Sequence, residues 1–493
     1  MSEPHHDVLQ EFARTAERHP DRTALVHDGR TLTVAELAAL VRATARRLGP
    51  DPGAVGVLAS RTPETVAALL GTLAAGGAYV PVDPAHPRAR RRAVLAAAGC
   101  RTLIASGPDR WAPEGVRVIE PPDRGVPGDG PAWEPAAVAG DAPAYILFTS
   151  GSTGAPKPVV TPRRAISAVT GALRELFGIT PADRVLQFAS LNWDTCLEEI
   201  LPALTAGAAL VFHDGARSGS FRRMLRAVAD ERVTVLDLPT AFWHELVRHL
   251  ADERAAPPPC VRLVIIGGEA VSPPRLADWR ALDTAGIRLL NTYGCTETTL
   301  ITHAIDLHGP LAEGETGAPI GRPLPHVVQR VTGEGELLVG GPSLALGYRG
   351  LPEETAARFV TPEPGAGRYF RTGDRVGVRE GGALVHEGRL DHELKIRGIR
   401  VDPAEVEAHI AGHPGVGAVA VAGVTVADRT TLAAYVVPRP EHGEGLAAEV
   451  REYLRDRVPG HLVPGRITVV PELAYTTSGK VDRAGSHRRY TTN

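Results

Sequence analysis

Short apolar runs, each about as long as one buried strand, alternate with helix-length segments along the first part of the chain. Three such runs are AVGVLAS (54–60), VTVLDLPT (233–240) and VRLVIIGGEA (261–270). Residues 31–48 have helical spacing of apolar residues and begin with Thr33 and Glu36 at the spacing of a capping box. A second helix is predicted over about 63–75. Strands alternating with helices favour an α/β fold with mainly parallel sheets.

The pattern of glycines, strands and helices in the sequence changes twice towards the C-terminus. After about residue 320, short glycine-punctuated strands such as GELLVGG and GGALVHEG predict a β-rich subdomain. From Asp391 on, DPAEVEAHI and LAAEVREYLRDRV predict helices around short strands, hence a small α+β unit. We therefore expect a large N-terminal domain of layered α/β subdomains over 1–390 and a C-terminal domain over 391–493. Residues 107–143, rich in Pro and Gly, are predicted to be a surface excursion.

Bulk composition excludes several classes of protein. The net charge of −3 and pI near 6.7 give no electrostatic reason to expect a nucleic acid or a membrane as partner. The N-terminus lacks the features of a secretory signal, and the longest apolar run, 66–82, is interrupted by glycines. The four cysteines follow neither a metal-binding nor a disulfide pattern. A cytoplasmic protein is expected.

Lysine is rare in this chain. Lys and Arg total 54, yet only Lys157, Lys395 and Lys480 are lysines. Arginine carries a planar fork and lysine a compact ammonium, so the retained lysines are candidates for a function that needs the ammonium.

The stretch TSGSTGAPKP, residues 149–158, predicts a loop that wraps phosphate. Gly151 and Gly154 allow backbone amides to converge on an anion. Four hydroxyl donors flank them: Thr149, Ser150, Ser152 and Thr153. The spacing is not that of a Walker loop, and the prolines beside Lys157 exclude a helix interior there. The alternative for this stretch alone is a flexible surface turn.

YILFTSGSTGAPKPVV resembles the phosphate loop of the adenylate-forming superfamily, which includes acyl-CoA synthetases, luciferases and the adenylation domains of nonribosomal peptide synthetases. Further segments resemble the successive core motifs of this family in order: LAAGGAYVPVDPAHPRAR, NTYGCTETT, GYRGLPEETAARF, YFRTGD, GRLDHELKIRGIRVDPAEVE and TTSGKVDR. GGAYVPVDP and GKVDR are typical of the peptide-synthetase branch. Pro158 and Cys295 depart from the usual glycine and proline, which affects loop shape rather than chemistry.

The resemblance implies a site for ATP and Mg²⁺. The implied ATP-binding residues are Thr149, Ser150, Gly151, Ser152, Thr153, Gly154, Lys157, Gly268, Glu269, Ala270, Tyr293, Gly294, Thr296, Asp374 and Arg389. It implies that Glu297 helps to place Mg²⁺ and that Lys480 is the catalytic lysine of adenylation. Asp391 matches the hinge, and Lys395 the region used in the second conformation. The C-terminal domain is thus expected to be a mobile lid that rotates between adenylation and thioester formation.

Three acids indicate the substrate. By resemblance, Asp194 pairs with the amino group of an amino acid, a residue that acyl-CoA synthetases generally lack. Glu198 lies four residues on, so the two carboxylates share a helical face and repel unless a cation relieves them. Asp237 interrupts an apolar strand, and carboxylates are rarely buried unpaired. Glu198 and Asp237 together suit a distal ammonium; the alternative is that either one pairs with an internal arginine.

The remaining pocket positions, implied by the resemblance, are Thr195, Ile265, Gly267, Thr292, Leu300 and Ile301. With the three acids and Lys480, this set looks most like those associated with β-lysine in peptide-antibiotic pathways. L-lysine and L-ornithine are the neighbouring possibilities, because nothing in the sequence measures the position of the second amino group.

Ten residues follow Arg483, the end of the last motif, and no condensation domain precedes the core. We therefore expect a free-standing ligase that loads the phosphopantetheine thiol of a separate peptidyl carrier protein, with an MbtH-like protein as a possible partner. The alternatives are an acyl- or aryl-CoA ligase and a non-catalytic nucleotide-binding protein. Asp194 argues against the first, and the intact Lys480, Glu297 and Asp374 against the second.

Overall fold

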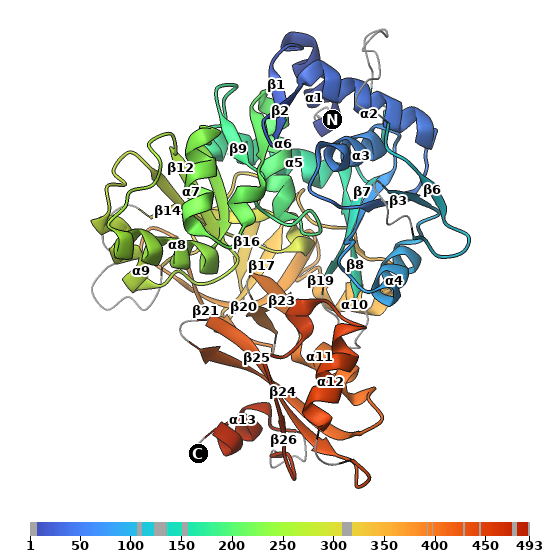
Figure 1. Cartoon of the computed structure of the whole chain (residues 1–493), viewed down its shortest axis with the longest axis vertical. Helices are drawn as coiled ribbons and strands as arrows, with labels where there is room; N and C mark the ends of the chain where they lie inside the picture. The colour runs from blue at the N-terminus through green and yellow to red at the C-terminus, as the bar shows by residue number, and fades with distance from the viewer. Residues whose placement is uncertain are drawn as a thin grey trace. The chain divides into compact units, whose positions relative to one another are not determined.

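The computed structural model describes residues 7–105, 111–122, 135, 137–149, 156–307, 318–391, 393–396, 398–426, 429–442, 445–475 and 481–491. The chain forms two compact units (Figure 1). The first comprises Met1–Pro84, Leu95–Leu147 and Pro158–Leu390, and the second Ala85–Val94, Phe148–Lys157 and Asp391–Asn493. None of the helices in these described ranges is long and apolar enough to cross a membrane.

The largest sheet of the first unit has nine strands. Their order is β15 (Arg322–Pro323), β14 (Ile301–Asp306), β13 (Arg288–Gly294), β12 (Leu263–Gly267), β11 (Val235–Pro239), β9 (Arg184–Leu186), β10 (Ala209–Phe212), β1 (Thr23–His27) and β2 (Arg30–Thr33). The strands from β13 to β1 pair in parallel, and the outer pairs are antiparallel. The runs at 233–240 and 261–270 are its neighbouring central strands β11 and β12, as predicted.

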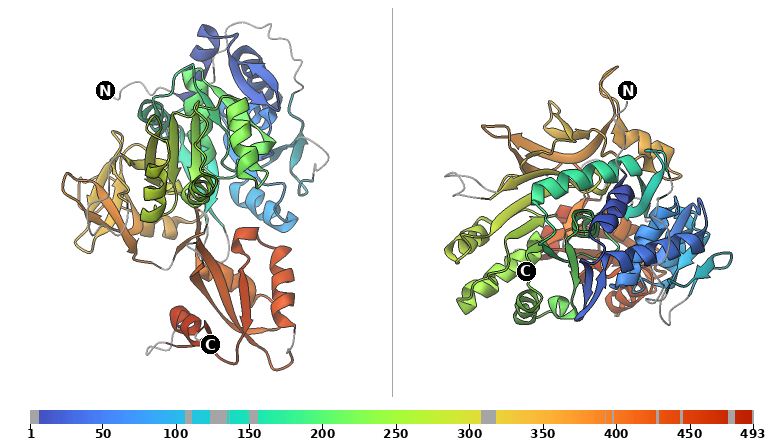
Figure 2. Two further views of the ribbon diagram at one scale, coloured as in Figure 1. Left: turned by 60° about the vertical axis from the view of Figure 1, so that its left-hand side comes forward. Right: turned by 90° about the horizontal axis from the view of Figure 1, so that it is seen from above.

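Side chains of this sheet alternate between two hydrophobic cores. Val235, Leu263 and Leu290 point into one core, and their neighbours Leu236 and Val264 into the other. The helices α5 (Arg163–Phe177) and α6 (Thr195–Ala206) pack on the first face; α7 (Phe221–Asp230), α8 (Thr240–Glu253) and α9 (Pro273–Ala281) pack on the second (Figures 1 and 2). The strands are therefore buried on both faces, which explains their unbroken apolar runs.

A seven-stranded sheet completes the layered α/β part. Its order is β18 (Gly347–Tyr348), β8 (Lys157–Pro162), β7 (Pro143–Thr149), β4 (Ala78–Val82), β3 (Ala54–Leu58), β5 (Thr102–Ile104) and β6 (Arg117–Ile119). The helices α1 (Val8–Arg18), α2 (Val34–Leu48), α3 (Pro63–Ala74) and α4 (Arg88–Ala98) lie in the same N-terminal stretch of the chain. The capping box of α2 forms as predicted: Glu36 N donates to Thr33 Oγ1, and Thr33 N to Glu36 Oε2. The predicted excursion at 107–143 contains the strand β6, which is too short to show a periodicity in the sequence.

The β-rich part of the first unit is a five-stranded antiparallel sheet. Its order is β16 (Val328–Val331), β17 (Glu336–Gly340), β20 (Tyr369–Val378) and β19 (Phe359–Val360), with β21 (Leu384–Arg389) also paired to β20. The helix α10 (Pro352–Arg358) precedes β19. This arrangement confirms the β-rich texture predicted after residue 320.

The second unit is α+β, as predicted for the C-terminal region. It contains a hairpin of β22 (Leu394–Ile396) and β23 (Ile399–Val401) and a sheet of β24 (Val416–Val426), β25 (Arg429–Pro438) and β26 (Arg466–Val469). Three helices complete it: α11 (Pro403–Ala411), α12 (Leu446–Arg455) and α13 (Arg483–Thr491). Val401, Val406, Leu432 and Val450 belong to its own hydrophobic core.

Candidate active site

The carboxyl ends of three neighbouring parallel strands define the site in the first unit. The register pairs Pro239 of β11 with Gly267 of β12, and Gly267 with Thr292 of β13. Ligands of α/β sheets bind at this edge. Gly268, Glu269 and Ala270 follow β12 here, and Thr296 and Glu297 follow β13 in a short 3₁₀ turn. The fold thus brings together residues that the sequence analysis took from separate motifs.

Two glycines at this edge stand where a Cβ would collide with a neighbouring segment. A Cβ on Gly267 would lie 2.5 Å from Thr292 Oγ1, whose hydroxyl donates to the Ile266 carbonyl at 2.9 Å. A Cβ on Gly294 would lie 1.8 Å from the carbonyl oxygen of Leu300. Larger residues at either position would force β13 away from its neighbours, which explains glycine at both predicted site positions.

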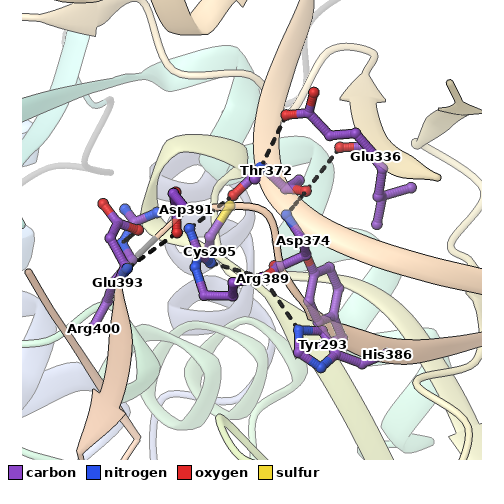
Figure 3. A network of polar contacts seen from close by, with 12 residues as sticks. Tyr293, Cys295, Glu336, Thr372, Asp374, His386, Arg389, Asp391, Glu393 and Arg400 are labelled. Atoms are coloured by element: carbon purple, nitrogen blue, oxygen red, sulfur yellow. Dashed lines mark hydrogen bonds and ion pairs between the residues drawn. The ribbon is translucent and has the colours of Figure 1, made fainter. Parts of the chain in front are cut away.

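Asp374 lies at the centre of a polar network on the strands of the β-rich part (Figure 3). Arg389 Nη1 donates to Asp374 Oδ1 at 2.7 Å, and the hydroxyl of Tyr293 donates to Oδ2 at 2.5 Å. His386 Nε2 lies 3.2 Å from Oδ1. Burial, together with the Asp374 charge, raises the pKa of Tyr293 well above its usual range, so the phenol stays a donor. Asp374, Tyr293 and Arg389 were predicted as nucleotide contacts; His386 was not.

Glu336, which the sequence analysis did not single out, supports this network from the neighbouring strand. Arg371 donates to Glu336 Oε2 through Nε at 3.0 Å and Nη2 at 2.6 Å. The backbone N–H of Gly373 donates to Oε1 at 3.1 Å. Glu336 is 3% exposed and so fixes the backbone one residue before Asp374. The only available sequence signal was a charged residue at the start of the apolar strand β17.

Glu297 is buried at 1% exposure, and its Oε1 accepts from the Tyr348 hydroxyl at 2.9 Å. Among the described residues, no group of three His, Cys, Asp or Glu side chains could hold a metal alone. A single carboxylate suits Mg²⁺, which keeps several waters and binds through one or two carboxylates plus substrate phosphates. The donor set therefore fits a magnesium ion held jointly by Glu297 and a nucleotide.

Asp194 is close to Glu297. It immediately precedes α6 with helical dihedral angles, φ −60° and ψ −31°, so it lies one turn before Glu198 as predicted. The Thr296 hydroxyl hydrogen-bonds its carboxylate. Burial, and secondarily the charge of Glu297, raises the pKa of Asp194, while the Thr296 bond opposes that rise. An ammonium group beside Asp194 would relieve both destabilising effects.

Glu198 of α6 and Asp237 of β11 line the same enclosed space, close enough that a hydrogen bond between their carboxyl groups contributes to the pKa of each. Glu198 is 7% exposed, and Asp237 Oδ2 is buried without a hydrogen-bond partner. Burial is the main cause that raises the pKa of Asp237 to about 7 and the pKa of Glu198 well above its usual range. No arginine or lysine in the described parts of the chain forms an ion pair with either carboxyl. The internal-arginine alternative is thus not what these residues adopt.

Glu199, beside Glu198, is a third residue that the sequence analysis missed, after His386 and Glu336. Its Oε1 accepts from the N–H groups of Phe188 and Ala189 at 2.9 and 2.8 Å, and its Oε2 from Gln187 Nε2 at 2.9 Å. Arg61 binds the carbonyl groups of the same three residues at 2.7 to 3.3 Å. Glu199 and Arg61 thus hold the backbone N–H and carbonyl groups of this turn, which precedes Asp194. The sequence alone does not show that Glu199 has this structural role while Glu198 faces Asp237.

The remaining predicted pocket residues divide by exposure. Ile265, Thr292, Leu300 and Ile301 are buried, whereas Thr195 is exposed. Ile265 lies directly beside Asp237 in the register of β11 and β12. Leu300 has φ of 59°, a backbone conformation that non-glycine residues rarely adopt and that is often found at functional sites.

Some predicted residues cannot be placed here. Ser150, Gly151, Ser152, Thr153, Gly154 and Lys480 lie outside the described residues. Thr149 ends β7 and Lys157 begins β8, so the predicted phosphate loop connects two strands. In the second unit, Lys395 lies on β22 opposite Arg400, and Asp391 accepts a hydrogen bond from the N–H of Glu393 at 3.2 Å.

Known proteins match the chain along most of its length. Residues 12–349 match the AMP-binding enzyme family and residues 405–480 its C-terminal domain. An isonitrile lipopeptide synthase of Streptomyces coeruleorubidus is 40% identical over 97% of this chain, which spans 33% of that synthase.

Many solved structures are also similar. One of them is NpsA-ThdA of Klebsiella oxytoca, an artificially fused adenylation–PCP di-domain of a nonribosomal peptide synthetase, with TM-score 0.82, 27% identity and coverage of 95% of this chain and 94% of that one. Another is holo-PA1221, which contains adenylation and PCP domains, with TM-score 0.83, 25% identity and coverage of 98% and 84%. With its matched residues, its two-unit architecture and its site geometry, the chain belongs to the AMP-binding enzyme family of adenylate-forming ligases.

Proposed function

We propose that this protein activates a diamino acid with ATP and transfers it to a carrier-protein thiol. The amino acid carboxylate attacks the α-phosphate of ATP, giving an aminoacyl adenylate and pyrophosphate. The thiol of a phosphopantetheine arm then attacks the acyl carbon, giving a thioester and AMP. The observation that carries the choice of substrate is the buried Glu198–Asp237 pair, which has no cationic partner among the described residues.

The nucleotide half of the site supports the first step. Asp374, held by Arg389 and Tyr293, would accept the ribose hydroxyls, and Gly268, Glu269 and Ala270 would line the adenine edge. Glu297 would hold Mg²⁺, which when bound offsets the charge of the phosphates. The residues Thr149–Gly154 with Lys157 would hold the pyrophosphate end, and Lys480 would bridge the substrate carboxylate and a phosphate oxygen.

The amino acid half supports a cation at each end of the substrate. Asp194 would pair with the amino group near the reacting carboxylate, and Glu198 and Asp237 with the distal ammonium. Each contact is a charge-assisted hydrogen bond in a dry site. Ile265, Leu300 and Ile301 would line the apolar stem between them. Within the diamino acids we favour β-lysine, and L-lysine or L-ornithine next, because the whole pocket set most resembles that associated with β-lysine.

A carrier protein is supported as partner by two of the similar solved structures, NpsA-ThdA and holo-PA1221, which each combine an adenylation domain with a PCP domain. We propose that residues 391–493 rotate about Asp391 as a lid, so that Lys480 serves adenylation and the region of Lys395 serves thioester formation. An MbtH-like partner and a place in peptide-antibiotic biosynthesis belong to the same proposal. A reaction that consumes ATP is in keeping with a cytoplasmic enzyme.

The test is amino-acid-dependent exchange of pyrophosphate into ATP with β-lysine, L-lysine, L-ornithine, norleucine and leucine. We expect diamino acids to exceed norleucine at least about tenfold in kcat/KM, because a neutral side chain leaves the buried acids unpaired. Equal activity on norleucine would contradict the assignment. Acceptor tests with coenzyme A and with a phosphopantetheinylated carrier separate a CoA ligase from a carrier-loading enzyme. Absence of exchange with every acid would favour a non-catalytic nucleotide-binding protein.

A further inference from the structure

The contact between Glu198 and Asp237 has a chemical requirement of its own. Two carboxyl groups can hydrogen-bond each other only when one of them carries a proton, because ionised carboxylates are acceptors only. Glu198 is 7% exposed, and Asp237 is half-buried, with its Oδ2 buried and without a hydrogen-bond partner. Two carboxyl groups in contact cannot both ionise where water is excluded. With no ligand bound, the pair therefore holds one proton.

None of the charged groups around the pair supplies a positive charge that could replace this proton. On α6, the titratable neighbours are Asp194, Cys196 and Glu199, and each adds negative charge or none. The two nearby cations, Arg61 and Arg217, act on Glu199. Burial, and secondarily the charge of Asp237, raises the pKa of Glu199 to about 8, although its three N–H donors oppose that rise. The shared proton is thus the local positive charge on the Glu198–Asp237 pair.

The remaining elements against the pair are apolar. Phe177 of α5, Ile179, Val185 of β9 and Ile265 of β12 line an enclosed space beside it that has no room for a water molecule or for an ammonium group, so a ligand reaches the pair from another side or after these side chains move. Water therefore cannot solvate a second negative charge. A ligand group that enters must itself supply the compensating charge and the hydrogen-bond donors.

We propose that the distal ammonium of the substrate replaces this proton, so that binding of a diamino acid expels one proton from the Glu198–Asp237 pair. The inference rests on the proposed function. The balance is one proton bound to the pair on one side, and one ammonium bound to the pair plus one released proton on the other. The net charge at the pair is −1 in both states, since the ammonium brings the charge that the proton removes.

A nearby cation makes the release favourable. An opposite charge within about 4–6 Å lowers a carboxyl pKa by about 1–3 units. The shared proton lies on Glu198, which donates to Asp237 and whose pKa is raised well above its usual range, and contact with an ammonium lowers that pKa. An aliphatic ammonium with a pKa near 10 keeps its own protons. A neutral side chain supplies no such charge and leaves the shared proton in place.

Proton exchange also sets how selectivity depends on pH. Since one proton leaves as the diamino acid binds, its affinity should rise by up to about tenfold per pH unit while the pair is protonated, and level off above the pKa of the pair. The affinity for norleucine should not depend on the protonation of the pair in this way. Discrimination against neutral acids should therefore increase with rising pH.

The experiment is calorimetric titration of the protein with L-lysine, β-lysine and norleucine at pH 7 in buffers of different ionisation enthalpy, which yields the number of protons released. We expect about one more proton for the diamino acids than for norleucine, whose titration also records any proton lost from Asp194. The titration with L-lysine is repeated on the Glu198→Gln variant. Its amide is a permanent donor to Asp237, so the release of the extra proton should disappear. Asp183→Asn, a change at a buried carboxylate outside the site, should retain the release. Binding of a diamino acid to the wild type with no extra proton would overturn the proposal.

An infrared measurement without ligand separates this inference from the proposed function. The wild type at pH 7 should show the C=O stretch of protonated carboxyl groups, and Asp237→Asn and Glu198→Gln should each remove the component that belongs to the pair, which is separate from any component of Glu199. If neither substitution removes such a band, the shared proton is refuted, whatever the substrate. If the band is present but no diamino acid is activated in the pyrophosphate-exchange assay, the assigned substrate class is wrong. The proposed replacement of the proton by a substrate ammonium is then wrong as well.

Discussion

The two acidic centres of the first unit differ in what already surrounds them. Asp374 is met by a guanidinium, a phenol and an imidazole, at 2.7, 2.5 and 3.2 Å. Asp237 is met by another carboxyl group and, within the described chain, by no basic side chain. The first charge is compensated by the protein itself. The second centre is an acid pair that lacks a cation.

This difference indicates two kinds of ligand. A carboxylate whose charge is already compensated binds a neutral donor, such as a sugar hydroxyl, without needing to gain a positive charge. A buried acid pair favours a ligand that brings a positive charge with it. Changes at Asp374 should therefore affect every amino acid substrate alike, whereas changes at the acid pair should affect only cationic ones.

Asp374→Asn should have the largest effect. It leaves the side chain of Arg389 buried beside a neutral amide, and removal of one member of such a pair costs about 3–5 kcal/mol. We expect kcat/KM for ATP in pyrophosphate exchange to fall by at least about 100-fold with every amino acid tested. The control is Asp183→Asn, which removes a carboxylate bound to Arg262 at 2.7 Å elsewhere in the unit and should leave the nucleotide kinetics unchanged. A loss confined to diamino acids would contradict the division between the two centres.

Asp237→Asn should produce the second largest effect, and a selective one. Loss of one partner of a buried charged contact costs about 2–5 kcal/mol, so kcat/KM for the preferred diamino acid should fall by about 30-fold or more. Norleucine should lose much less, because its neutral end never pairs with Asp237. The measurement is the ratio of the two kcat/KM values. An unchanged ratio would contradict the assignment of Asp237 to the substrate pocket, without affecting the proposed adenylation reaction.

The sequence predicted the acids better than it predicted what surrounds them. The α/β layers, the β-rich part and the place of Asp237 in an apolar strand were readable because strand and helix periodicities are local, whereas Asp194 was taken from the resemblance to the family. Residues that act through a distant partner were not readable. Glu336 and Glu199 each hold backbone N–H groups of another segment, and nothing local in the sequence shows that such a contact will form. His386 likewise acquires its role only when β21 pairs with β20.

Glu336→Gln tests one of these missed residues. The amide weakens the bonds from Arg371 and from the N–H of Gly373, and hydrogen bonds to a charged group contribute about 1.5–3 kcal/mol. Because Arg371 is half-exposed, water replaces part of that loss. We expect about a tenfold increase in KM for ATP and a lowered Tm, with the preference among amino acids retained. A changed amino acid preference would mean that the two centres are coupled through the sheet.

His386→Phe should have the smallest effect. His386 lies 3.2 Å from Asp374 Oδ1, an oxygen that Arg389 already contacts at 2.7 Å, and its side chain is 31% exposed. Partly exposed pairs of this kind contribute about 0–1 kcal/mol, which corresponds to at most about a fivefold rise in KM for ATP. The measurement is KM for ATP at saturating amino acid, beside His386→Gln, which keeps a polar group there. If His386→Phe matched Asp374→Asn in severity, the three donors would act as one unit, and the compensation of Asp374 would depend on all of them rather than mainly on Arg389.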